Sequence, residues 1–175
     1  MDAQPDVKAL LERALDQTAR LLDEVSPEQY DHTSTCSDWT VGDLVQHVVA
    51  SPRNFVSMYS GQDVDWAHPP ALSDDPAGDF RQAAGELLEH LESQDGDVSS
   101  SAALPEFAVH SWDLARSTGS AQPLDDEVAT HALAFMSNNL TPENRSGVFA
   151  PEVHVGDDLS IQDRLAAFAG RTPAT

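Results

Sequence analysis

Residues 5–25, PDVKALLERALDQTARLLDEV, carry the clearest structural pattern in the chain. The residues of the predicted buried face recur every three or four positions, at Val7, Leu10, Leu11, Ala14, Leu15, Thr18, Leu21, Leu22 and Val25. This spacing places them on one side of an α-helix with a proline near its start, where proline is tolerated. Ser26 and Pro27 interrupt the pattern, so we expect the helix to end there.

The same helical period recurs along the rest of the chain, and no convincing strand pattern is present. The further predicted helices are one from about residue 40 that contains Pro52, one through 80–91, one that starts near 105 and ends before 119, one over 125–140, and a short one after 160. We expect loops over 61–78, 93–101 and 141–159. Several amphipathic helices with one apolar stripe each indicate an all-α bundle. A length of 175 residues predicts a single domain over 1–175.

The charge balance narrows the range of partners. Asp and Glu number 30 against 9 Lys and Arg, a formal net charge of −21. Such a surface repels phosphate backbones and anionic membranes, so neither nucleic acid nor a membrane is an expected partner. A proteome adapted to high salt and an acidic lineage would both produce this balance. The oligomeric state, monomer or homodimer, stays open.

Three features of the sequence indicate the cellular compartment of the protein. Cys36 is the single cysteine, which excludes an intramolecular disulfide. The first residues lack a signal-peptide pattern, and no apolar run is long enough to span a bilayer. We therefore expect a cytoplasmic protein.

Among the seven histidines, two stand out as candidates for chemistry. Glu106 and His110 are spaced i, i+4, so both side chains point to one side of their predicted helix. A stabilising surface Glu–His pair is one interpretation, and a pair of metal ligands is the other. His47 flanks the buried face of the helix that follows residue 40. It fits a hydrogen-bonded histidine at the core edge or a third ligand, and Asp43 and Asp113 are candidate partners that would orient the imidazoles.

The remaining candidates are weaker. We expect solvated surface imidazoles at His32, His68, His90, His131 and His154. Cys36 lies just before the second predicted helix, which leaves three interpretations open: a reactive thiolate, a zinc ligand, or a small partly buried apolar residue. No nucleophile motif or glycine-rich phosphate loop is present.

Three segments resemble a known family. Residues 35–47, TCSDWTVGDLVQH, resemble the signature PTPCsdWtVrdLvxH of metal-binding proteins related to the N-terminal domain of mycothiol-dependent maleylpyruvate isomerase, in the DinB-like superfamily. Residues 106–115, EFAVHSWDLA, resemble the ExxxHxWDLA motif of that group, and residues 163–171, DRLAAFAGR, resemble its ending DRLxAFxGR. The order of the three segments makes a chance resemblance improbable.

The resemblance implies a DinB-like four-helix bundle with additional short C-terminal helices. It also implies a divalent metal, usually zinc, held by His47, Glu106 and His110. Relatives in this group include isomerases and transferases that use mycothiol or a similar low-molecular-weight thiol. The implied activity is a metal that activates such a thiol or water, with a small-molecule thiol or electrophile as partner. No general base or other catalytic residue can be assigned.

The chain departs from the family before the second motif. The segment over 93–104 is shorter than in the family, and Pro105 directly precedes Glu106. Because proline belongs in a first helical turn, we expect the helix to start near 105 with Glu106 in its first turn and the bundle to be abbreviated there. This departure favours an alternative function, a non-catalytic metal-binding or stress-response module.

Overall fold

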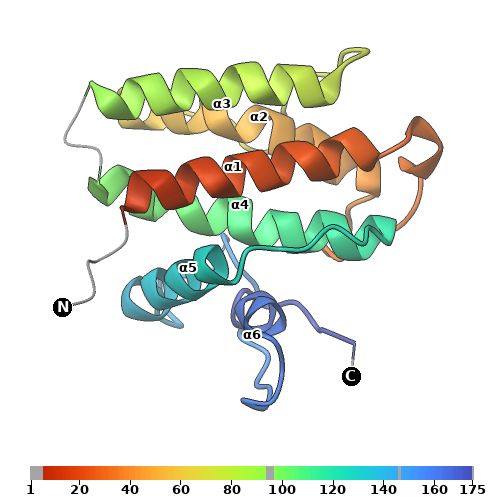
Figure 1. The fold of residues 1–175 in the computed structure, drawn as a ribbon, viewed down its shortest axis with the longest axis vertical. Coiled ribbons are helices and arrows are strands. Elements are labelled where there is room, and N and C mark those ends of the chain that lie inside the picture. Colours follow the sequence, from red (N-terminus) through yellow and green to blue (C-terminus); the bar gives the residue numbers. More distant parts are fainter. Residues whose placement is uncertain (1–5, 94–96, 146, 175) are drawn as a thin grey trace.

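The structure is a computed structural model that describes residues 6–93, 97–145 and 147–174 (Figure 1). Its helices are α1 (Val7–Glu24), the short 3₁₀ helix η1 (Pro27–Gln29), α2 (Val41–Tyr59), α3 (Pro76–Glu92), α4 (Asp97–Thr118), α5 (Asp126–Asn139) and α6 (Ile161–Phe168). Within the described ranges, the β-structure amounts to one isolated bridge between Thr33 and Thr40. The prediction of an all-α protein is therefore confirmed.

The first four long helices form a bundle around one apolar core. In this bundle α1 packs against α3 and α4, and α2 packs against the same two helices. Helices α5 and α6 pack against each other and against α4, on one side of the bundle (Figure 1). Helix α4 is thus shared by the bundle and the two C-terminal helices. This arrangement is the expected DinB-like bundle with additional C-terminal helices.

Most of the residues that the helical period predicted for the buried face of α1 lie in the core. Leu10, Leu11, Ala14, Leu15, Leu21 and Leu22 of α1 are all buried. They meet large side chains from the other helices, including Leu44, Phe80, Leu87, Phe107 and Leu114. No helix in the described residues is both long enough and apolar enough to cross a membrane.

Side-chain caps define where several helices begin. The Asp6 carboxylate accepts from the Lys8 backbone at the start of α1. Thr40 and Asp43 form a reciprocal capping box at the start of α2. At the start of α6, the Ser160 hydroxyl accepts from the Asp163 backbone at 3.1 Å. Each cap satisfies a backbone donor that a helix N-terminus leaves without a partner.

The prediction for the start of α4 is wrong. The helix begins at Asp97, so residues 97–101 are helical rather than loop, while 94–96 lie outside the described residues. Pro105 is inside the helix and buried together with Ala103 and Leu104. Burial of this apolar face compensates for the backbone hydrogen bond that a proline removes. Glu106 is therefore not in the first turn, and the bundle is not abbreviated at this end.

Pro52 likewise lies inside a helix, because α2 continues past it to Tyr59. The proline ring is buried among the core residues, and the helix does not end there. Uninterrupted α2 and α4 are what place His47 opposite Glu106 and His110.

Candidate metal centre

The three predicted ligands converge between α2 and α4. His47 comes from the second turn of α2, and Glu106 and His110 lie one turn apart on α4. One ligand atom from each lies within 4.8 Å of the other two. Nε2 of His47 is 2.7 Å from Oε1 of Glu106, and Nε2 of His110 is 3.5 Å from the same oxygen. The two imidazole rings meet edge to face at a centroid distance of 4.9 Å.

This cluster is enclosed but not sealed. The side chains of His47, Glu106 and His110 are 12%, 16% and 9% exposed, respectively. The three side chains are therefore mostly shielded from water and keep a small exposed fraction. Low local polarity strengthens the interaction of a carboxylate with any cation placed beside it.

A buried serine fixes the position of the Glu106 carboxylate. Ser51 lies one turn after His47 on α2, and its hydroxyl donates to Oε1 of Glu106 at 2.7 Å. The same hydroxyl is 2.9 Å from the backbone oxygen of His47. Since a serine has one hydrogen to donate, it serves one of these oxygens at a time.

A buried carboxylate orients His110 from the opposite side. Nδ1 of His110 is 2.9 Å from Oδ2 of Asp113, and the Asp113 side chain has no exposed surface. Because Asp113 takes Nδ1, the remaining nitrogen of His110, Nε2, faces Glu106 and His47. The predicted role of Asp113 as an orienting partner fits this geometry. Asp43 does not share that role, since its carboxylate closes the capping box with Thr40 instead.

The electrostatics of the cluster couple these groups. Burial alone would raise the pKa of Glu106, but the nearby charge of His110 and the hydrogen bond with His47 lower it from 4.5 to about 2. Burial alone would lower the pKa of His110, but the charge of Glu106 and the hydrogen bond to Asp113 raise it from 6.5 to about 10. These interactions favour the charged forms of both groups, a protonated His110 beside an ionised Glu106.

Two tryptophan rings lie beside the histidines of the cluster. The Trp39 ring lies 4.9 Å from the His47 ring and 6.4 Å from the His110 ring, between centroids. The Trp66 ring lies 5.9 Å from the His47 ring and packs edge to face on Phe55. Gln46 holds the loop that carries Trp66, because its amide donates to the backbone oxygens of Pro69 and Pro70. These rings limit the access of water to His47.

Cys36 lies near His110 on the side of Asp113, in the loop that the Thr33–Thr40 bridge closes. Its thiol donates to Oδ2 of Asp113 at 3.3 Å. Arg171, from the end of the third sequence motif, donates to both oxygens of Asp113 at 3.1 and 2.8 Å. The hydroxyl of Thr35 donates to Oδ1 of Asp113 at 2.6 Å. Asp113 thus joins α4, the loop before α2 and the C-terminal segment.

Sequence reasoning missed part of this site. Ser51 shares the side of His47 by its spacing, but nothing in the sequence connects it to Glu106. Arg171 belongs to a matched motif without an assigned role, and no sequence signal marks Trp66. Among the expected surface histidines, His90 differs: its Nε2 is buried and has no hydrogen-bond partner in the described part of the chain.

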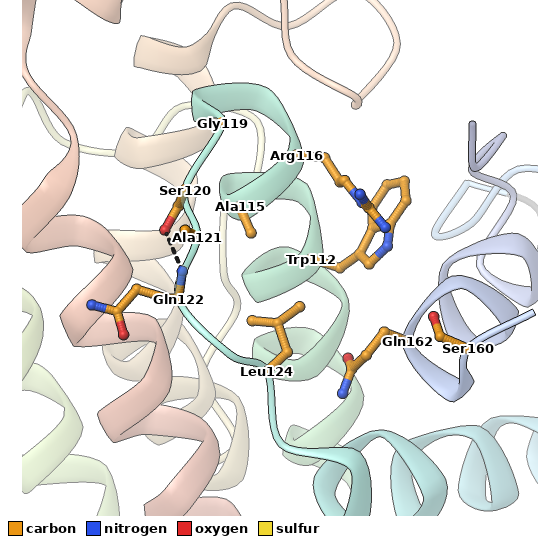
Figure 2. Close-up of a pocket in the computed structure, with 10 residues that line it drawn as sticks. All are labelled: Trp112, Ala115, Arg116, Gly119, Ser120, Ala121, Gln122, Leu124, Ser160 and Gln162. Carbon is orange, nitrogen blue, oxygen red and sulfur yellow. Dashed lines mark hydrogen bonds between the residues drawn. The ribbon is translucent and has the colours of Figure 1, made fainter. Parts of the chain in front are cut away.

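The two pockets described in the structure lie away from the cluster. One lies between α4, the 119–124 connection and the start of α6, with Trp112, Arg116 and Gln162 among its lining residues (Figure 2). The other is near the end of α1 and the start of α3. Neither is lined by the three candidate ligands, so neither provides a preformed chamber beside them.

The fold and the site together define a class: a helical-bundle protein with two histidines and a carboxylate clustered between two of its helices. Residues 11–132 match the model of the mycothiol maleylpyruvate isomerase N-terminal domain family, and the chain belongs to that family. It is also similar to two uncharacterized proteins of Mycobacterium tuberculosis, from strains CDC 1551 / Oshkosh and ATCC 25618 / H37Rv. Each is 31% identical, over 92% of this chain and 95% of the relative. No solved structure matches the chain.

Proposed function

We propose that the protein binds one divalent metal ion, with zinc as the first candidate, through His47, Glu106 and His110. We further propose that the ion serves to activate a low-molecular-weight thiol, such as mycothiol, or water. The observation that carries the proposal is the convergence of the three ligand atoms within 4.8 Å. Membership of the mycothiol maleylpyruvate isomerase N-terminal domain family supports the choice of a thiol.

The donor set fits such an ion. Two imidazole nitrogens and one carboxylate are ligands that zinc accepts, and they leave a coordination position open for a further ligand. The Nδ1 atom of His110 is already held by Asp113, which is the arrangement that metal-binding histidines favour. A divalent ion at this site would lower the pKa of a thiol or water bound to it.

The surrounding residues have separate tasks in this proposal. Ser51 holds the Glu106 carboxylate, and Asp113 holds the His110 ring. Trp39 and Trp66 limit water beside His47. We assign no general base. A cytoplasmic location is part of the proposal, since a chain with a single cysteine suits a reducing compartment.

Metal titration tests the first part of the proposal. Calorimetric titration with Zn²⁺ is expected to give one site per chain, and His47→Ala and His110→Ala are expected to lose it. His131→Ala is the matched control, because this histidine lies on α5 and hydrogen-bonds the Glu127 backbone oxygen of its own helix. Wild-type protein that binds no zinc, or ligand variants that bind as tightly as wild type, would overturn the metal site.

An activity assay tests the second part. Metal-loaded and metal-free protein are compared for turnover with mycothiol and other bacterial thiols in the presence of unsaturated or halogenated electrophiles. Turnover that requires both metal and thiol supports the proposal. A non-catalytic metal-binding or stress-response module is the second candidate. Tight metal binding without turnover would select this second candidate.

A further inference from the structure

A second group of metal-ligating side chains adjoins the first. The thiol of Cys36, one ring nitrogen of His110 and a carboxylate oxygen of Asp113 lie within 4.8 Å of one another. His110 belongs to both groups. Thiolate is a softer ligand than carboxylate and binds the borderline ion zinc well, so this second group would compete for the same ion.

Arg171 already supplies a positive charge at the second group. Its guanidinium donates from Nε and Nη2 to the two oxygens of Asp113, and Nη2 lies 3.5 Å from the sulfur of Cys36. Its Nη1 donates to the Ala169 backbone oxygen at 2.9 Å, which anchors the guanidinium to the turn after α6. The Arg171 side chain is 13% exposed and that of Asp113 is fully buried.

This contact has two physical consequences. A buried carboxylate that is paired with a guanidinium has its charge compensated, so a divalent ion gains less by approaching it. The planar guanidinium also fills the space beside both carboxylate oxygens with directed hydrogen bonds, which a lysine ammonium cannot reproduce. A second ion between Cys36 and Asp113 would have to displace this cation.

We propose that Arg171 is a positioning residue that reserves Asp113 for His110 and keeps Cys36 out of the ligand set of the metal. The metal then binds through nitrogen and oxygen ligands alone. This inference rests on the proposed metal site, and it assigns a role to the C-terminal motif that the family resemblance leaves without one. Gly170, directly before Arg171, has a φ of +87°, in the left-handed region that favours glycine.

Cobalt spectroscopy tests the inference, since a thiolate bound to Co²⁺ gives an intense near-ultraviolet charge-transfer band that nitrogen and oxygen ligands do not give. Wild-type protein is expected to bind Co²⁺ without this band, and Cys36→Ser is expected to leave both spectrum and affinity unchanged. Arg171→Gln is expected to show the band and to bind Co²⁺ roughly 10-fold more weakly, the usual scale for loss of an outer-shell partner. Arg171→Lys is expected to restore part of that affinity.

The controls separate the inference from the metal site itself. Arg164→Gln changes an arginine of the same motif whose partner, Asp157, is exposed, and it is expected to match wild type. The band in Arg171→Gln must disappear when Cys36→Ser is added. A thiolate band in wild-type protein overturns the inference alone, even if Arg171→Gln fails to fold. A folded Arg171→Gln with wild-type spectrum and affinity also overturns it, whereas wild type that binds no Co²⁺ overturns both proposals.

Discussion

At the scale of residues, the contacts of the candidate metal site meet at one carboxylate oxygen of Glu106. Oε1 of Glu106 is 2.7 Å from Nε2 of His47 and 2.7 Å from the hydroxyl of Ser51. The Ser51 hydroxyl is fully enclosed, so water cannot easily take its place. A ligand carboxylate that is held in this way loses little rotational freedom when an ion binds, and this lowers the cost of binding.

Ser51→Ala is expected to weaken zinc binding by about 10-fold, the lower end of the range for outer-shell changes, because Glu106 loses the donor that orients it. Calorimetric titration measures the effect. Ser57→Ala is the matched control, since Ser57 lies on the same helix without a role at the site. Equal affinities for the two variants would show that Ser51 does not position Glu106.

At the scale of elements, the sequence predicted some helices better than others for physical reasons. The apolar stripe and clear end signals predicted α1. The start of α4 could not be predicted, because Pro105 is a local signal for a helix start. Only packing against the other helices shows that Ala103 and Leu104 extend the buried face before it.

The same distinction between local and long-range information applies to the candidate site. Helical spacing alone placed Glu106 and His110 on one side of α4. Their convergence with His47 depends on how α2 packs against α4, and before the structure only the family resemblance implied it. The contacts of Ser51 with Glu106 and of Arg171 with Asp113 join distant parts of the chain. No periodicity in a sequence encodes such pairs.

The turn after α6 provides a test at this scale. Gly170→Ala is expected to destabilise the protein more than Gly61→Ala. Both glycines have left-handed φ values, +87° and +75°, so alanine is strained at either position by roughly 1–2 kcal/mol. At Gly170 the added Cβ would also lie 2.7 Å from the Ala150 side chain, whereas Gly61 has open space. Overpacking of this kind costs about 1–3 kcal/mol more.

Urea denaturation of the two glycine variants measures the difference in the free energy of unfolding. Because Arg171 follows Gly170, we also expect Gly170→Ala to weaken metal binding, while Gly61→Ala leaves it intact. Equal losses of stability in the two variants would mean that the C-terminal segment does not pack on Ala150 as the structure describes.

At the scale of the whole molecule, the net charge creates a long-range electrostatic field that acts on ions approaching the candidate site. A net charge of −21 attracts cations toward the surface and repels anions, and salt screens both effects. Many arginines already pair with carboxylates, as Arg13 does with Asp125 and Arg81 with Asp23. The overall field therefore favours the approach of a divalent ion and disfavours a highly anionic ligand.

The response of whole-protein stability to pH follows from the coupled charges of the site. The pKa of His110 is raised from 6.5 to about 10, so its stabilising contribution is complete below pH 6.5 and is lost as the pH rises toward 10. The pKa of Glu106 is lowered from 4.5 to about 2, so its contribution is present above pH 4.5 and is lost as the pH falls toward 2. For these two groups, the metal-free protein is most stable between pH 4.5 and pH 6.5.

A bound ion reverses the alkaline part of this trend. Metal binding requires a neutral His110, so the ion competes with a proton and binds more tightly as the pH rises. We expect the zinc-induced increase in Tm to grow between about pH 6 and about pH 8, because a ligand that binds only the folded state stabilises it more when it binds more tightly. Differential scanning calorimetry with and without zinc measures this increase. Differences between wild type and a control variant complete the test. His110→Gln is the control, because it removes both the alkaline loss of stability without metal and the metal-induced gain. An increase in Tm that is constant or shrinks over this pH range would mean that the ion does not displace the proton from His110, and therefore does not bind where α2 meets α4.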